Sequence, residues 1–382
     1  MIVFTLIGVW EHRKVEELGD TFTGLTGKTK EDFGHGDATF VTYINVFNNP
    51  ITDLKMTESV EIDTKQNQVE YGDIFFTTSS ETPEEVGMSS VWLGNEANVY
   101  LNSFCFGYRP VTELAPYYMA FMLRSPNVRK KFMFLAQGIS RYNISKNRVM
   151  DIEIPVPNID EQRKVGQFFK DIDDLITLHQ RKLDQLKKLK KAYLHAMFVS
   201  MNTKKNKVPK LRFTDFEGDW ELCKLEEIVD VRSGRDYKHL GSGNIPVYGT
   251  GGYMLSVSEA LSYDEDAIGI GRKGTINNPY ILKAPFWTVD TLFYTVPKNN
   301  FDLNFIYSIF RKINWKSKDE STGVPSLSKK TINAVTVYIP SGSEQQRIGE
   351  FFKQIDNTIT LHQNKLEQLN ELKKSYLQNM FI

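Results

Sequence analysis

The sequence has only two cysteines, Cys105 and Cys223, among 382 residues. Two thiols are too few for a disulfide framework or a thiolate metal cluster, so we expect a protein of the reducing cytoplasm. Long hydrophobic runs are also absent. The apolar opening stretch at residues 1–10 is about half the length of a membrane span, and no cationic segment precedes it. From these absences we expect a protein that is neither secreted nor embedded in a membrane.

The sequence also lacks net charge, because 47 basic residues balance 47 acidic ones. This balance argues against a generic polyanion binder, but the charges are segregated along the chain. Residues 1–100 carry 6 basic and 17 acidic side chains, whereas residues 101–150 carry 8 basic and 1 acidic. The stretch 124–148 holds seven basic residues and no acid, interleaved with Phe132, Phe134 and Tyr142. This pattern predicts a stripe that faces phosphate groups.

An internal repeat organises the chain. Residues 161–198 and 344–381 match without a gap, with 24 of 38 positions identical. A second match, at a different offset, aligns the segment that begins Trp10-Glu11 with the one that begins Trp220-Glu221. The chain is therefore two copies of one plan, a globular unit followed by a helical segment. The residues between the matched segments differ, which indicates a duplicated frame with unlike fillings.

Each repeated segment has the seven-residue apolar spacing of a coiled-coil seam. We expect two helices of about 38 to 40 residues, roughly 60 Å long, that start after Pro157 and Pro340 with Asp160 and Ser343 as N-caps. The two helices most simply pair with each other in antiparallel orientation. The alternative is that each helix is buried on its own domain. His179 and His362 occupy the middle of the seams, and antiparallel pairing would bring them face to face.

Short β-branched runs broken by glycine and asparagine, with helical stretches near 116–123 and 303–312, predict α+β globular units. The fold class is therefore two α+β globular domains joined by two long antiparallel helices that form a coiled-coil spacer. The expected boundaries are a first domain at 1–157, a first helix at 158–199, a linker at 200–210, a second domain at 211–340 and a second helix at 341–382.

Three catalytic signals are weak. The run from Gly269 to Gly274 fits a dinucleotide fingerprint, but Pro279 soon follows and no long helix can start there. Residues 277–280 partly match the tetrapeptide of amino-methyltransferases, but no glycine-rich cofactor loop accompanies them. Asp53, Asp63 and Lys65 have the loose spacing of a Mg²⁺-dependent nuclease core. The six histidines show no metal-ligand spacing, so we expect no metal site.

The repeated helices, with the pattern EQR/EQQR…FF…D…I…H…KL…LKK…Y…MF, carry a resemblance to a known family. Unlike domains separate them, and the second domain contains the runs Ile245–Gly252, Ile268–Thr275 and Thr322–Lys329. In all these features the chain resembles the specificity subunit of type I restriction-modification systems. The resemblance covers essentially the whole sequence, and the runs quoted are typical of target-recognition domains.

The resemblance implies a non-catalytic DNA-recognition subunit. Each target-recognition domain would read one half of a bipartite asymmetric site in double-stranded DNA, and the helix pair would set the spacer. Two methyltransferase subunits would bind this framework, and restriction subunits could join them. S-adenosylmethionine, Mg²⁺ and ATP would then belong to the partner subunits, with no cofactor in this chain. The alternatives are a self-contained Mg²⁺-dependent nuclease and a coiled-coil adaptor that binds no nucleic acid.

Loops rich in basic, hydroxyl and amide side chains can reach phosphates and base edges. Each candidate alone could equally be a solvated surface group. In the first domain the candidate DNA contacts are Ser140, Arg141, Tyr142, Asn143 and Lys146. In the second domain they are Arg232, Arg235, Tyr237, Arg272, Lys273 and Lys329.

Overall fold

The chain folds into two compact units, which the computed structural model describes over residues 10–200 and 207–381. The first unit comprises Met1–His179 and Lys365–Ile382, and the second comprises Gln180–Asn364. Both long helices therefore contribute to both units.

Two segments discussed above lie outside the described residues: most of the apolar opening stretch, at 1–9, and positions 201–206 of the predicted linker. Within the described ranges no helix is long and apolar enough to cross a membrane.

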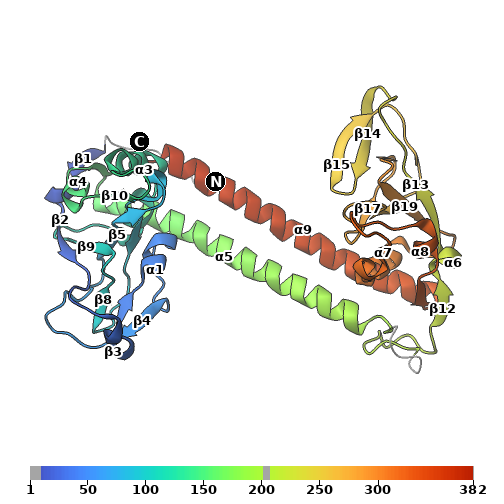
Figure 1. The fold of residues 1–382 in the computed structure, drawn as a ribbon, viewed down its shortest axis with the longest axis horizontal. Helices are drawn as coiled ribbons and strands as arrows, with labels where there is room; N and C mark the ends of the chain where they lie inside the picture. The colour runs from blue at the N-terminus through green and yellow to red at the C-terminus, as the bar shows by residue number, and fades with distance from the viewer. Residues whose placement is uncertain (1–9, 201–206, 382) are drawn as a thin grey trace. The chain divides into compact units, whose positions relative to one another are not determined.

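The first unit (Figure 1) combines short strands with short helices. Its strands are β1 (Glu11–Lys14), β2 (Gly19–Thr23), β3 (Phe33–Val41), β4 (Thr57–Val60), β5 (Ile74–Thr77), β6 (Ser79–Ser80), β7 (Ser89–Val91), β8 (Val99–Leu101), β9 (Cys105–Pro110), β10 (Tyr142–Asn143) and β11 (Glu153–Val156). Its short helices are α1 (Tyr43–Asn48), α2 (Pro116–Met122), α3 (Pro126–Leu135) and α4 (Lys146–Met150).

The second unit has the same kind of content. Its strands are β12 (Glu221–Lys224), β13 (Val229–Ser233), β14 (Ser242–Gly249), β15 (Gly252–Val257), β16 (Ala267–Gly271), β17 (Tyr280–Leu282), β18 (Trp287–Thr288), β19 (Leu292–Pro297) and β20 (Thr336–Ile339). Its short helices are α6 (Leu225–Ile228), α7 (Leu303–Lys312) and α8 (Lys329–Asn333). The predicted α+β content is confirmed in both units.

The two units share one sheet topology. The four-stranded sheet has the order β2-β9-β5-β7 in the first unit and β13-β19-β16-β17 in the second. The three-stranded sheets, β4-β3-β8 and β15-β14-β18, each contain one parallel pair, and β1-β11 matches β12-β20. The duplication therefore extends through the globular parts, and the interpretation of unlike fillings is wrong at the level of topology.

Two helices of 38 residues each, α5 (Ile159–Ala196) and α9 (Gly342–Asn379), form the repeated segments. Both predicted caps are wrong. Helix α9 begins at Gly342, so Ser343 lies inside its first turn. The side chain of Asn158 accepts a hydrogen bond from the Glu161 amide at 3.0 Å, so Asn158 caps α5 and Asp160 lies inside its first turn. Asparagine is a favoured N-cap because its side-chain oxygen accepts a hydrogen bond from a backbone amide of the first turn that has no partner within the helix.

In the first unit, the start of α5 packs against the end of α9. The rings of Phe168 and Tyr376 meet edge to face with centroids 5.0 Å apart, and Lys373 pairs with Asp173 at 2.5 Å. Since residue numbers rise along one helix as they fall along the other, these helix segments run antiparallel.

In the second unit, the end of α5 packs against the start of α9 through the repeat-equivalent residues. Tyr193 and Phe351 meet edge to face with centroids 5.1 Å apart, and Lys190 pairs with Asp356. Both units therefore use the same aromatic pair and the same ion pair between antiparallel helix segments.

The last phenylalanine of each repeat is a core residue of a globular unit. Phe381 is 1% exposed and packs in the first unit against Trp10, Tyr118 and Phe169. Phe198 is 4% exposed and packs in the second unit against Trp220, Phe305 and Phe352. The first repeat thus ends in the second unit, and the second repeat ends in the first.

Two glycines allow the long helices to approach the short ones. A Cβ at Gly166 would lie 2.5 Å from the backbone nitrogen of Tyr118 in α2. A Cβ at the repeat-equivalent Gly349 would lie 2.9 Å from the backbone nitrogen of Phe305 in α7. Backbone atoms cannot move aside as a flexible side chain can, so both positions require glycine.

We expect Gly166→Ala to destabilise the first unit. The overpacking costs about 1–3 kcal/mol, and the higher helix propensity of alanine offsets about 1 kcal/mol of it. A net loss of about 1–2 kcal/mol lowers Tm by roughly 2–8 °C in thermal unfolding of the full chain. Gly251→Ala is the matched control, because its Cβ would meet nothing within 4 Å. An unchanged Tm for Gly166→Ala would show that the helices are not in close contact.

Candidate nucleic-acid interface

In the second unit, two loops far apart in the sequence are joined by backbone hydrogen bonds. The first loop leaves β16 at Gly271, and the second precedes α8. The amide of Gly274 donates to the carbonyl of Pro325 at 2.8 Å, and the amide of Leu327 donates to the carbonyl of Arg272 at 2.9 Å. Two runs that the sequence marked as typical of one family thus form a single surface.

This surface is a groove rich in cations and hydroxyl groups. Arg272, Lys273 and Lys329 line it, and within the described residues none of the three forms an ion pair. The guanidinium of Arg272 lies 5.8 Å from the ring centroid of Phe293. The groove also presents Ser233, Ser321, Thr322, Ser326 and Ser328, with Glu320 as its one acidic residue. Unpaired cations beside hydroxyl groups suit the oxygen atoms of phosphates and the edges of bases.

The first unit builds an equivalent surface with different side chains. β10 pairs with β6 so that Asn143 lies opposite Ser79, and the amide of Ile144 donates to the carbonyl of Thr78 at 2.9 Å. In the second unit, Lys273 and Ser326 form the corresponding antiparallel β-bridge between their backbones. Thr78 and Ser79 therefore stand where the second unit has Arg272 and Lys273.

The predicted DNA contacts of the first unit gather at this surface. The Nη2 atom of Arg141 donates to Ser79 Oγ at 3.2 Å. Ser140, Asn143 and Lys146 are exposed beside it, whereas Tyr142 is half-buried against the core of the unit. The cation that Arg272 supplies in the second unit thus comes from the facing loop in the first.

The sequence analysis missed the hydroxyl run Thr78–Ser80, in which Ser79 and Ser80 are each only 7% exposed and Ser79 accepts a hydrogen bond from Arg141. Its only signal is its position after the apolar strand β5, just as Arg272 follows β16. Serine and threonine are common in any loop, so composition alone could not single them out.

The remaining candidates of the second unit lie apart from the groove. Arg232 is held by Glu265 at 2.6 Å and by Asp230 at 2.7 Å, and these hydrogen bonds raise its pKa. Arg235 is exposed next to Trp287, whose indole donates to the Arg235 carbonyl at 2.9 Å. Tyr237 packs on the core of the β14-β15-β18 sheet.

The predicted phosphate-facing stripe is partly wrong. Arg124 donates to the backbone carbonyls of Val46 at 2.7 Å and Ser89 at 2.7 Å, and Arg129 donates to the carbonyl of Gly87 at 2.7 Å. Burial lowers the pKa of Arg124 to about 9 and that of Arg129 to about 10. These two guanidinium groups hold loops in place and are not available to phosphates.

A family model decides the identity of the fold. The model described as "Type I restriction modification DNA specificity domain" matches residues 8–188 and again residues 217–371. The chain belongs to this specificity family. It is a DNA specificity subunit of the type I restriction-modification class, as its sequence predicted, and this identity favours DNA recognition over the nuclease and adaptor alternatives.

Relatives of the specificity family match along the whole chain. A protein of Methanocaldococcus jannaschii named as the MjaX type I restriction enzyme specificity subunit is 22% identical and covers 96% of this chain and 92% of its own. The crystal structure of a type I restriction-modification S subunit from M. genitalium covers 100% of this chain and 98% of its own, with 19% identity and a TM-score of 0.67. A structure described with assembly of a type I system covers 98% of both chains at 15% identity and a TM-score of 0.53.

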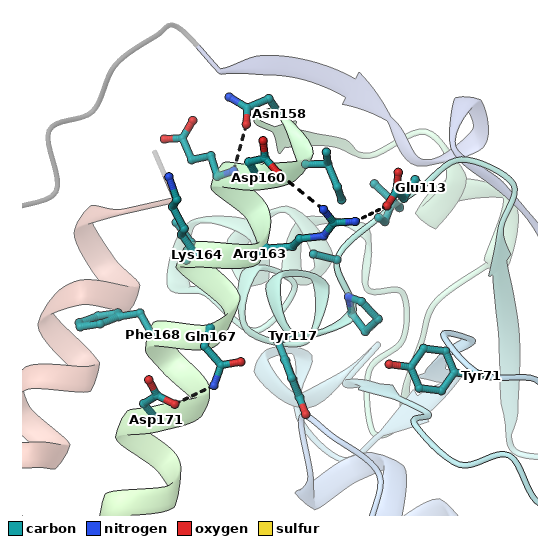
Figure 2. Close-up of a pocket in the computed structure, with 16 residues that line it drawn as sticks. Tyr71, Glu113, Tyr117, Asn158, Asp160, Arg163, Lys164, Gln167, Phe168 and Asp171 are labelled. Atoms are coloured by element: carbon teal, nitrogen blue, oxygen red, sulfur yellow. Dashed lines mark hydrogen bonds and ion pairs between the residues drawn. The ribbon is translucent and has the colours of Figure 1, made fainter.

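A hollow beside the start of α5 is another concave surface of this specificity subunit, but the arginine that lines it is already paired. Figure 2 shows Arg163 reaching from α5 to Glu113, which it contacts at 2.5 Å, with Asp160 3.5 Å away on its other side. Tyr71 and Tyr117 lie beside the hollow in the same view. Mutually paired side chains of this kind favour a structural surface over a reaction site.

The aspartates of the nuclease alternative stabilise local turns through hydrogen bonds to neighbouring residues. The Asp63 carboxylate accepts hydrogen bonds from the Gln66 side chain and the Lys65 amide, and it pairs with Lys28 at 3.1 Å. These contacts, of which the hydrogen bond from Gln66 has the largest effect, lower the pKa of Asp63 to about 2. Asp53 accepts from the Lys55 amide at 2.9 Å. Among the described residues no group of three His, Cys, Asp or Glu side chains could hold a metal ion.

Two further expectations meet the structure here. The run from Gly269 to Gly274 ends strand β16 and is followed by β17 instead of a helix, so it is not a dinucleotide-binding turn. His179 lies in the first unit on α5 and His362 in the second on α9, both half-buried. That these two imidazoles face each other stays a prediction.

Proposed function

We propose that each unit reads one half of a bipartite asymmetric site in double-stranded DNA. The observation that carries this proposal is the pair of equivalent surfaces, the Arg272–Lys273 groove and the Thr78–Arg141 surface. One backbone arrangement presents different side chains in the two units. Two such surfaces would bind the phosphate backbone of DNA in the same way while their different side chains contact different bases.

We further propose that α5 and α9 pair along their length and set the distance between the half-sites. The equivalent contacts Phe168–Tyr376 and Phe351–Tyr193 support an antiparallel arrangement with one repeated geometry. Half-sites on the same face of DNA lie near one helical turn, roughly 34 Å, apart. A helix pair of fixed length would then act as a spacer of fixed length.

The long helices would also dock two methyltransferase subunits. Leu178 and its repeat equivalent Leu361 are 60% and 67% exposed, and Leu189 and its equivalent Leu372 are 44% and 42% exposed. In α-helical geometry Leu178 lies 120–140° around the helix from the buried Ile172 and Leu183. An exposed apolar pattern that occurs twice fits two copies of one partner.

Catalysis would then reside in partner subunits. S-adenosylmethionine would be bound by the methyltransferase, and Mg²⁺ and ATP by restriction subunits if these join the complex. The test is to mix the purified chain with Mg²⁺ and DNA, alone and with its methyltransferase. We expect no cleavage by the chain alone and sequence-specific methylation only when both are present. Cleavage by the chain alone would contradict the proposal.

We expect Leu178→Asp with Leu361→Asp to release the methyltransferase. Placing a carboxylate in each apolar contact costs about 2–3 kcal/mol per site, which corresponds to roughly 30–150-fold weaker binding. Affinity is measured by calorimetry on the full chain. Leu222→Asp is the matched control, because Leu222 is 57% exposed and lies on strand β12 instead of on a long helix. Equal affinity of the double variant and the control would move the docking surface elsewhere.

A further inference from the structure

The most exposed large apolar side chains of the described residues lie close together in the sequence. Ile139 is 96% exposed and Phe134 is 82% exposed. Phe134 lies in the last turn of α3, and Ile139 lies in the segment that joins α3 to β10. Isoleucine and phenylalanine are normally buried, and single exceptions need no explanation. Two extreme cases within six residues, at the edge of the proposed DNA surface, indicate a function.

The loop that carries Ile139 has a defined shape. Gln137 and Asn143 exchange backbone hydrogen bonds at 2.9 and 2.8 Å, which closes the loop at its base. Gly138 has φ +145°, and a Cβ there would lie 1.9 Å from the carbonyl oxygen of Arg141. Only glycine fits this turn. The closed base and the tight turn hold the tip, with Ile139, away from the body of the unit.

The surroundings of this tip are cationic. Lys130, Arg141, Lys146 and Arg148 are exposed, and no acidic residue occurs between positions 124 and 148. Glu85, which accepts a hydrogen bond from Ser80 beside β10, is an acidic residue near this cationic segment. An apolar tip among mostly cationic side chains suits a polyanion with an apolar interior. Double-stranded DNA has both properties, since stacked bases lie between its phosphate strands.

The second unit repeats this arrangement with a different sequence. Val324 follows Gly323, is 56% exposed, and lines the groove that contains Arg272 and Lys273. Each loop then continues into an apolar-Ser-Lys sequence that begins a short helix, α4 or α8. Loops that differ in length thus both present glycine followed by an exposed β-branched aliphatic residue.

We propose that Ile139 and Val324 are wedges that insert between adjacent base pairs, one in each half-site. The proposal rests on the DNA-reading function proposed above. An aliphatic side chain pushed into a base step partly unstacks it and kinks the duplex. Pyrimidine–purine steps deform most easily, so each wedge selects a flexible step that no side chain contacts by hydrogen bonding.

The test uses the assembled complex with its methyltransferase and duplexes that carry 2-aminopurine at successive positions of the methylated motif. Fluorescence of 2-aminopurine rises when its base unstacks. The wild-type complex raises fluorescence at one step in each half-site. Ile139→Ser abolishes the rise in one half only and weakens binding roughly tenfold, and Val324→Ser does the same in the other half. Val111→Ser, which alters a side chain 68% exposed in the first unit, leaves both signals unchanged.

Other results overturn the wedge. Unchanged fluorescence and affinity in Ile139→Ser show that the tip does not enter DNA, while site-specific methylation would still support the proposed function. A second outcome is that Ile139→Ser weakens binding without changing fluorescence, and that this difference in affinity disappears on DNA in which uracil replaces thymine. That outcome assigns the tip to a thymine methyl group in the groove. Binding to anionic vesicles that Ile139→Ser abolishes assigns it to a membrane. A wild-type complex with no preference for any motif contradicts the proposed function itself.

Discussion

Replacing residues 211–340 with the corresponding domain of a relative changes one half of the methylated motif and leaves the other half intact. The second unit keeps the groove of Arg272 and Lys273 entirely within this range. The graft also replaces Trp220 and Phe305, which pack on Phe198 of the retained helix segment. The donor must therefore carry aromatic residues at these two positions for the unit to close.

The measurement is single-molecule sequencing of plasmid DNA modified by the chimeric complex. Co-purification with the methyltransferase distinguishes a chimera that folds from one that does not. The control graft takes its donor domain from a relative whose second half-site has the same sequence as that of this chain. We expect this graft to leave the whole methylated motif unchanged. A graft that altered both halves would contradict independent reading by the two units.

Changing Arg272 and Lys273 together to alanine gives the second large effect, a loss of DNA affinity of about 10–100-fold. Neither cation has a carboxylate partner within the described residues, so both are free to meet phosphates. Each phosphate contact contributes about −0.9 to the slope of log affinity against log salt concentration. The double variant should therefore flatten this slope by roughly 2, measured by titration of labelled DNA with the assembled complex.

The matched control removes the same charge from the same unit. Lys316→Ala with Lys318→Ala alters two lysines outside the groove, and it should change affinity much less. An equal loss in both double variants would mean that only net charge matters. An unchanged slope in Arg272→Ala with Lys273→Ala would remove the groove from the interface.

The two repeated helices could be predicted from the sequence, because they depend on patterns within one stretch of chain. The repeated segments gave helices of the expected length, since heptad spacing and the flanking prolines are signals within one stretch of chain. The helix at Leu303–Lys312 was also predicted at its observed bounds. The common sheet topology could not be predicted, because it depends on pairings such as β5 with β9 between residues far apart.

The charged residues show the same limit. Arg232 was predicted as a DNA contact, but the strand places Asp230 two residues away on the same face, and Glu265 from a distant loop also pairs with it. Arg124 was assigned to a surface stripe because residues 124–148 hold seven basic residues and no acid. In the structure, four consecutive carbonyl groups of residues 46–49 accept hydrogen bonds from its guanidinium group. Sequence reveals which charges exist, and tertiary packing decides which of them stay available.

The most direct test of the central claim is single-molecule sequencing of DNA methylated by the methyltransferase with and without this chain. The account predicts a bipartite motif of two unlike halves, separated by a spacer of fixed length, that appears only when the chain is present. A continuous motif, or the same motif in the absence of the chain, would contradict the claim that the two units read two half-sites.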